Sequence, residues 1–394
     1  MFADRIHRIQ PSATLAMTSK AAELRAKGVD VINLSVGEPD FPTPKNIQNA
    51  AIKAMDDGFT RYTPGAGMMA LRQAAADKMK RDNNLDYDPK EIIISCGGKH
   101  SLYNACQVLF QTGDEVIIFS PYWVSFPDFV SVTGATPVFV NTDASKQFEP
   151  NFEDLSKKLT SNTKGVIINS PSNPTGGVWC DDAVKKVLAI ARNKDLWVFS
   201  DECYEQLTYD VKYTSTAILA DDDSKILTFQ SCSKTYAMTG WRIGYTAGNF
   251  DVINAMSKLQ GQSTSCPNSI AQVAAIEALS GDQSAVTKMR DAFKIRRELV
   301  VSRLNSINGV TCEMPGGAFY VFPDFKDYMG KSFNGEKINT SSDLSMYFIN
   351  EKAVITVPGD SFGAPNNIRF SYAASEEELN NALDRVEDAL NNLV

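Results

Sequence analysis

The chain has 394 residues, of which 43% are hydrophobic, so it can bury a large core, and its length favours two or three domains over one. A formal net charge of -8 argues against nucleic acid as the main partner. The longest apolar runs have the length of a strand and fall far short of the roughly 20 residues that span a bilayer, so no membrane partner is expected.

Cysteine and histidine usage restricts the chemistry. Seven cysteines at irregular spacings include no CxxC pair, which fits neither a disulfide framework nor a zinc ribbon. The two histidines, His7 and His100, are too few for most histidine-based catalysis or for a histidine-built metal site. No metal is therefore expected, and a lysine amine is the candidate for moving protons.

The start of the chain, Met1–Ile6, has no apolar signal core, so a cytoplasmic location is expected. Residues 1–45 are expected to form an N-terminal arm and part of a smaller domain. A large domain is expected over residues 46–290, and the rest of the smaller α+β domain over residues 291–394.

Between residues 45 and 290, short β-branched runs alternate with segments of helical periodicity. Six runs are predicted as strands, at residues 91–95, 115–120, 164–169, 196–200, 225–230 and 242–248. This alternation predicts an α/β fold in which helices wrap a mostly parallel sheet. In such sheets ligands bind beyond the carboxyl ends of the strands.

Polar clusters follow five of these strands, namely Gly97–Lys99, Pro121–Trp123, Asn173–Gly176, Asp201–Tyr204 and Lys234. The first cluster precedes a helix predicted over residues 100–110, so its backbone N–H groups form a candidate phosphate cup, although a plain tight turn is the alternative. Neither GxxxxGK[ST] nor GxGxxG is present, which makes nucleotide binding the weaker interpretation.

The turn Ser231–Lys234, with Arg242 eight positions after the lysine, is the strongest chemical signal. A lysine amine can hold an aldehyde cofactor as a Schiff base, while serine hydroxyls and a guanidinium supply donors for a phosphate dianion. The pattern predicts a pyridoxal phosphate site. The alternative is a solvated lysine in a surface turn.

Other polar residues fit the same cofactor. Asp201 would pair with a protonated pyridine nitrogen, or else be an N-cap or surface carboxylate. Tyr204 and Asn173 could donate to the ring oxygen, and Trp123 could stack on the ring or anchor the core. Beyond residue 290, long helices are predicted over residues 289–304 and 375–393. Between them Arg369 lies on a predicted strand, as a clamp for an α-carboxylate or as a surface arginine.

Several motifs together make the chain resemble a fold-type I pyridoxal phosphate aminotransferase, of the aspartate aminotransferase branch found in bacteria and plant plastids. They span nearly the whole length: Gly37–Phe41, Tyr62–Gly67, Pro121–Ser125, Ser170–Gly176, Ser200–Glu202, Ser233–Lys234 and Ile368–Tyr372. One departure is Cys232 with Thr235–Tyr236, where relatives carry other small or apolar residues beside the lysine.

The resemblance implies roles for these residues. Lys234 would carry the cofactor and move the substrate proton, Gly37 would let the substrate approach, and Arg369 would clamp its α-carboxylate. The phosphate would be held by Ser231, Ser233, Arg242 and the amides of Gly98 and Lys99. Tyr62 would reach the cofactor of the other subunit, which implies a homodimer with shared active sites. The small-molecule partners would be amino acids and 2-oxo acids.

The resemblance also bears on specificity. Lys99 would recognise a second carboxylate, which favours aspartate as the amino donor and 2-oxoglutarate as the acceptor. Thr14, in a Pro-Ser-x-Thr sequence, together with Lys99 makes prephenate, giving arogenate, the serious alternative. A β-lyase or a decarboxylase would use the same fold and lysine. A cofactor-binding regulator would need an added DNA-binding module, for which no residues are available.

Overall fold

The computed structural model describes residues 2–11 and 13–394, with side chains for all of these except residues 13–16 and 18. A central sheet has eight strands in the order β2-β9-β8-β7-β6-β3-β4-β5. Their bounds are β2 Ile92–Ser95, β3 Glu115–Ser120, β4 Thr136–Asp143, β5 Glu149–Pro150, β6 Thr163–Asn169, β7 Trp197–Asp201, β8 Ile226–Ser231 and β9 Gly244–Gly248. Only β9 and β5 run antiparallel to their neighbours, so the predicted mostly parallel sheet is confirmed.

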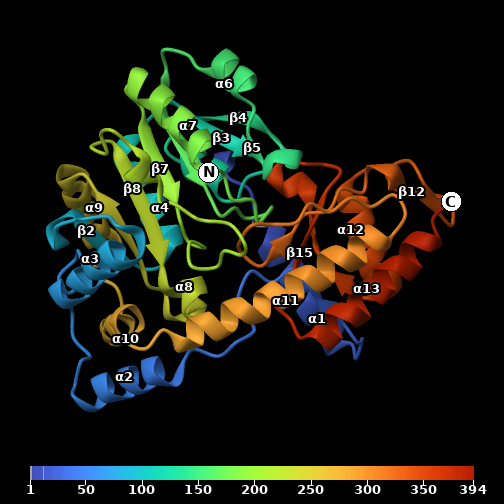
Figure 1. Cartoon of the computed structure of the whole chain (residues 1–394), viewed down its shortest axis with the longest axis horizontal. Helices are drawn as coiled ribbons and strands as arrows, with labels where there is room; N and C mark the ends of the chain where they lie inside the picture. Colours follow the sequence, from blue (N-terminus) through green and yellow to red (C-terminus); the bar gives the residue numbers. More distant parts are fainter. Residues whose placement is uncertain (1, 12) are drawn as a thin grey trace.

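Helices cover both faces of this sheet (Figure 1). The helices of this part of the chain are α2 Lys45–Asp56, which packs on α10, α3 Met69–Asn83, α4 Gly98–Leu109, α5 Phe126–Ser131, α6 Phe152–Lys158, α7 Asp181–Asn193, α8 Cys232–Thr235, α9 Phe250–Ser263 and α10 Ser269–Ser280. Within β2, Ile92 and Ile94 join the core under α3, α7 and α10, while Ile93 joins the core under α4, α5 and α9. Because successive residues of a strand point to opposite faces, a sheet covered on both sides has continuous apolar strands, as the sequence indicated.

The remaining elements form a second layer around a separate core (Figure 1). Its helices are α1 Ala13–Ala26, α11 Ser284–Ser306, α12 Ser341–Lys352 and α13 Glu376–Asn391. Its strands are β1 Ile32–Asn33, β10 Tyr320–Val321, β11 Ser332–Phe333, β12 Glu336–Lys337, β13 Val354–Ile355, β14 Val357–Pro358 and β15 Ile368–Ser371. The parallel pair β1–β13 joins the N-terminal segment to this layer. The expected domain boundaries stay predictions, and α11 runs across the one at residue 290.

Short 3-10 helices complete the chain: η1 Asp4–Arg8, η2 Pro89–Glu91, η3 Ala144–Lys146, η4 Thr216–Leu219, η5 Thr239–Trp241, η6 Lys326–Tyr328 and η7 Gly359–Phe362. The closing helix α13 shows how local sequence sets an element. Ser375 accepts a hydrogen bond from the Glu378 amide, and the Glu378 carboxylate accepts one from the Ser375 amide. Such a capping box stabilises the start of a helix, so α13 begins within one residue of the predicted start.

Candidate active site

A cavity of about 560 Å³ opens at the carboxyl ends of β6, β7 and β8, where ligands were expected. We call it the site cavity. Every residue predicted for the site lines it except Tyr62 and Thr14: Gly37, Gly98, Lys99, Trp123, Asn173, Asp201, Tyr204, Ser231, Ser233, Lys234, Arg242 and Arg369. Residues far apart in sequence therefore meet in one hollow.

An anion-binding corner forms where α4 begins, beside the turn after β8. Arg242 lies in the left-handed backbone region, with φ of 57°, and its Nη1 donates to the Thr239 carbonyl at 2.8 Å. Gly97 has φ of 91°, and a Cβ there would overlap the Arg242 guanidinium, so only glycine allows this approach. The guanidinium, the Ser231 and Ser233 hydroxyls and the first amides of α4 form a donor set suited to a phosphate dianion.

Lys234 lies on the short helix α8, which begins after Ser231 because the Ser231 hydroxyl accepts from the Ser233 amide at 3.3 Å. The Lys234 ammonium donates to the Gly37 carbonyl. Burial lowers the pKa of Lys234, and the nearby Arg242 and Arg369 guanidinium groups lower it further. A lowered pKa raises the fraction of neutral amine, the nucleophilic form, near neutral pH.

Asp201 ends β7 and is buried, so it is not a surface carboxylate. Burial raises the pKa of Asp201 to about 7, although the Cys203 amide donates to its Oδ1 at 3.2 Å. Within the described part of the chain no lysine or arginine forms an ion pair with it. The neighbouring Glu202, also buried, accepts from the Ser215 hydroxyl at 2.7 Å and the Thr216 amide at 3.0 Å. Neither acid has a cationic partner among the described residues, but Glu202 accepts several hydrogen bonds from neutral groups, whereas Asp201 accepts one from the Cys203 amide.

Arg369 lies on β15 with 1% of its surface exposed, so it is not a surface arginine. Its Nη1 donates to Asn173 Oδ1 at 2.9 Å, and its Nη2 donates to the Ser35 carbonyl at 2.6 Å. The Tyr320 ring packs against it at 4.5 Å, and Nε has no hydrogen-bond partner. No carboxylate of the described residues forms an ion pair with Arg369. A buried cation without a counter-ion is costly, which indicates a site that an anionic ligand completes.

Lys99, at the start of α4, is a second unpaired cation of the cavity. Its ammonium lies 5.1 Å from the centroid of the Trp123 ring. The Trp123 ring in turn packs edge-on against Phe126 and Phe129 of α5, at 5.3 and 5.8 Å. Burial lowers the pKa of Lys99, as does the Arg242 guanidinium. Among the described residues Lys99 forms no ion pair within 4.0 Å.

Other lining residues carry no predicted role, among them Tyr320, Asn169 and Cys203. The Tyr320 hydroxyl hydrogen-bonds the Tyr204 hydroxyl at 2.9 Å, and Asn169 Oδ1 accepts from the Asn173 amide at 2.9 Å. Asn169 ends a correctly predicted strand and could have been found by that position. Tyr320 comes from the second layer, and nothing in its local sequence places it beside Tyr204.

Two predicted residues remain outside the cavity. Tyr62 is 89% exposed and does not line it. The backbone of Thr14 belongs to α1, but its side chain lies outside the described residues. Neither predicted role is therefore visible in a single chain.

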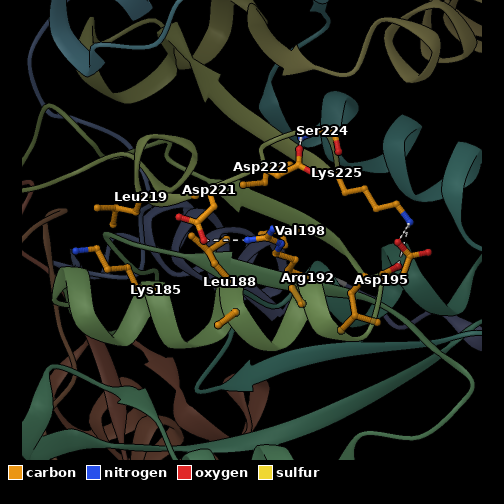
Figure 2. Close-up of a pocket in the computed structure, with 15 residues that line it drawn as sticks. Lys185, Leu188, Arg192, Asp195, Val198, Leu219, Asp221, Asp222, Ser224 and Lys225 are labelled. Atoms are coloured by element: carbon orange, nitrogen blue, oxygen red, sulfur yellow. Dashed lines mark hydrogen bonds and ion pairs between the residues drawn. The ribbon is translucent and has the colours of Figure 1, made fainter.

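A second cavity of about 380 Å³ lies between α7 and the segment before β8, at the amino ends of β7 and β8 (Figure 2). We call it the α7 cavity. Its floor is apolar, with Leu188 and Val198, and its rim is charged. Figure 2 shows Arg192 paired with Asp221, at 3.0 Å, and Lys225 directed to Asp195. No residue predicted for the site lies in it.

The described residues contain no helix long and apolar enough to cross a membrane. They also contain no cluster of three or more histidine, cysteine or acidic side chains placed to hold a metal ion. The expected cytoplasmic location stays a prediction.

The α/β fold and a cavity that gathers a partly buried lysine, an anion-binding corner and an unpaired guanidinium fit a site for a small anionic ligand. Over residues 29–386 the sequence matches the family described as aminotransferase class I and II. The chain belongs to this family and is an enzyme of the transaminase class, which confirms the resemblance seen in its motifs.

Individual relatives cover nearly the whole chain. It is 46% identical over 389 residues to a probable aspartate/prephenate aminotransferase of Rhizobium leguminosarum bv. phaseoli, covering 98% of this chain and 97% of that protein. It is 45% identical over 386 residues to an aspartate aminotransferase of Geobacillus stearothermophilus, covering 98% and 97%. The crystal structure of the aspartate aminotransferase from Rhizobium meliloti matches with a TM-score of 0.96 at 39% identity, covering 100% of both chains.

Proposed function

We propose that the site cavity binds pyridoxal phosphate. The phosphate would lie in the anion-binding corner, on Arg242, Ser231, Ser233 and the amides of Gly98 and Lys99. Asp201 would pair with the ring nitrogen, which gives its buried carboxylate the cation that it lacks in the chain alone. Lys234 would carry the cofactor through its amine. When bound, the cofactor supplies an electron sink for negative charge at the substrate Cα.

The protein's own groups would then orient the substrate and move its proton. Arg369 would bind the α-carboxylate through the donor that is unpartnered in the structure. Lys234, with a lowered pKa, would take and return the proton as an amine. Asn173 and Tyr204 would hydrogen-bond the ring oxygen of the cofactor, and Trp123 would stack on the face of its ring. Asn173 is already hydrogen-bonded to Arg369, and Tyr204 to Tyr320. Gly37 would leave room for the substrate.

We propose transamination of L-aspartate with 2-oxoglutarate, giving oxaloacetate and L-glutamate. One observation carries this choice: two cations, Arg369 and Lys99, line one cavity with Lys234, and neither has a carboxylate partner among the described residues. Two cations suit a dicarboxylic substrate better than the single α-carboxylate that a β-lyase or decarboxylase requires. Aspartate aminotransferases among the relatives support it.

Prephenate is the second candidate acceptor, and its product would be arogenate. Like 2-oxoglutarate, prephenate carries a second carboxylate away from its 2-oxo acid group. Lys99 could bind this second carboxylate. Relatives named aspartate/prephenate aminotransferase support this reading. The proposed contribution of Thr14 is a prediction to be tested by substitution.

We also propose a homodimer with active sites shared between subunits. Tyr62 and several apolar side chains close to it in sequence are strongly exposed, among them Ile52, Met55, Phe59 and Met69. A second copy covering this face would bury them and bring its Tyr62 to the phosphate in the neighbouring subunit.

Two experiments test the homodimer. Light scattering gives the mass of the assembly in solution. Mixing inactive Lys234→Ala with a weakened Tyr62→Phe variant should raise activity only if sites are shared.

The visible absorption spectrum of the purified protein tests the function. We expect a cofactor band that is lost when L-aspartate is added and returns when 2-oxoglutarate or oxaloacetate follows. Return of the band with prephenate as well would establish dual activity. A protein whose band does not respond to aspartate would contradict the proposal and direct attention to another amino acid.

A further inference from the structure

Helix α5 connects the Lys99 end of the site cavity to the N-terminal arm. Phe126 and Phe129 of α5 support the Trp123 ring over which Lys99 lies. Asp128, between them in sequence, does not line the cavity. Instead its Oδ1 accepts a hydrogen bond from the backbone amide of Gln10, at 3.2 Å. One short helix therefore holds both the platform for a cavity cation and a contact to residues 118 positions away.

The start of the arm, residues 2–11, is mostly exposed. No residue of η1 is buried, and Gln10 itself is exposed. Arg8 lies close to Gly134 in the loop after α5, so the arm follows this helix and its loop. An exposed segment of this kind loses its position readily unless specific bonds hold it, which makes the Asp128 contact important for the arm.

The Asp128 carboxylate also interacts with the cavity through charge. It is half-buried, and burial raises its pKa, while the Gln10 amide and the Lys99 ammonium act in the opposite direction. Asp128 correspondingly opposes the burial that lowers the pKa of Lys99. The two groups do not form an ion pair, so the Lys99 ammonium remains free for a ligand.

We propose that Asp128 is a specificity-determining positioning residue: by holding the Gln10 amide it keeps the N-terminal arm beside the Lys99 end of the cavity, where the second carboxylate of a substrate binds. The inference rests on the proposed dicarboxylate function. Asp128 acts through the arm and does not touch the substrate, and its loss is felt by dicarboxylic substrates and much less by neutral ones.

Four variants of the full-length holoenzyme separate the contact from its surroundings. Asp128→Ala removes the acceptor, whereas Asp128→Asn keeps an acceptor oxygen and removes the charge. Gln10→Pro removes the donor without altering Asp128, and Gln10→Ala keeps the donor and changes only the side chain. The readouts are KM and kcat for aspartate and for alanine, calorimetric binding of the non-reacting dicarboxylate maleate, and hydrogen exchange of the residue 10 amide.

We expect Asp128→Ala and Gln10→Pro each to raise the KM for aspartate and the Kd for maleate by roughly ten-fold, the loss of about one hydrogen bond to a charged group. Their kcat, and all constants for alanine, should change less than about two-fold. Gln10→Ala should stay close to wild type, and Asp128→Asn, which keeps a neutral acceptor, should lie between wild type and Asp128→Ala. The double variant should be no worse than either single one, because both remove the same bond. The residue 10 amide should exchange roughly ten-fold faster in Asp128→Ala.

Equal losses for aspartate and alanine, or a loss confined to kcat, would show a merely structural role and overturn the inference. The inference would also be overturned if Asp128→Asn were as impaired as Asp128→Ala. The same holds if hydrogen exchange of the residue 10 amide were unchanged in Asp128→Ala. The exchange measurement does not depend on the substrate. A wild-type protein that binds no dicarboxylate would instead defeat the proposed function, and with it this specificity role, whatever the exchange rates are.

Discussion

The two cavities differ in how their cations are paired. Lys225 of the α7 cavity is paired with Asp195 at 2.5 Å and also lies over the ring of Trp197, which does not line that cavity, at 5.7 Å. In the site cavity, Lys99 lies over the Trp123 ring at 5.1 Å and has no carboxylate partner among the described residues. The same lysine–tryptophan arrangement is complete in one place and lacks an anion in the other. Within the described part of the chain, Arg369 and Asp201 of the site cavity are unpaired as well, and both are buried. Cavity size alone does not identify a binding site, whereas buried charge that the chain leaves unpaired does.

The largest effect is expected from Lys234→Ala. Among the described residues, Lys99 is the other lysine that lines the cavity, and it is more exposed, so it cannot replace Lys234. Turnover of aspartate should fall more than about 1,000-fold, as expected when a nucleophile is removed. Lys185→Ala, in the α7 cavity, is the matched control and should retain wild-type turnover. A coupled assay for oxaloacetate measures both, and substantial transamination by Lys234→Ala would refute the assigned role.

A smaller but still large effect is expected from Arg369→Lys. A lysine cannot provide the planar pair of donors that binds a carboxylate in bidentate fashion, so kcat/KM should fall roughly 100-fold for aspartate and alanine alike. Arg192→Lys, which alters an exposed arginine already paired with Asp221, should change neither. A loss restricted to aspartate would mean that Arg369 binds the distal carboxylate and not the common one.

Lys99→Ala tests the comparison directly. Removing the unpaired lysine should lower kcat/KM for aspartate about ten-fold to 100-fold while that for alanine stays within about two-fold. Lys225→Ala removes the paired lysine from the similar arrangement and should have no effect on either substrate. Parallel losses with both amino acids would remove the proposed role of Lys99.

The last prediction is on stability, not on activity, and concerns Asp201 in the cofactor-free chain. An acid whose pKa is raised from 3.8 to about 7 keeps its proton in the folded state after the unfolded chain has lost it. Stability therefore falls as pH rises from about 4 to 7, by up to about 4 kcal/mol. Asp201→Asn cannot ionise, so the difference between wild type and variant should grow across this range in urea unfolding. A constant difference would contradict the raised pKa.

Much of the site could be predicted because its residues follow strand ends. The runs that became β2, β3, β6, β7 and β8 are continuous and apolar, so their carboxyl ends, and the polar residues after them, were visible in the sequence. Strands β4 and β5 were not predicted. Most residues of β4 are only partly buried or exposed, and β5 has two residues, so neither has the apolar signal of a central strand.

Contacts made over long sequence distances could not be predicted. Tyr320 reaches Tyr204 only because the second layer packs against the sheet, and Gln10 reaches Asp128 through a backbone amide that every residue but proline possesses. Neither contact leaves a trace in local composition. The homodimer and the role of Tyr62 were expected from the resemblance alone, and they stay predictions because they concern a surface that a single chain leaves exposed.

Strand β9 runs antiparallel to β8, and Gly244 at its start pairs with Ser231 at the end of β8. The side-chain donors of the anion-binding corner, Ser231, Ser233 and Arg242, therefore lie within one chain loop of residues 231–244, whereas its backbone amides come from the distant start of α4. The proposed substrate clamp joins Arg369 to Asn173, 196 positions apart. Because short loops close at a lower entropic cost than long ones, the three side-chain donors can come together earlier in folding than the clamp. A folding chain would thus gather most of its anion donors before Arg369 meets Asn173.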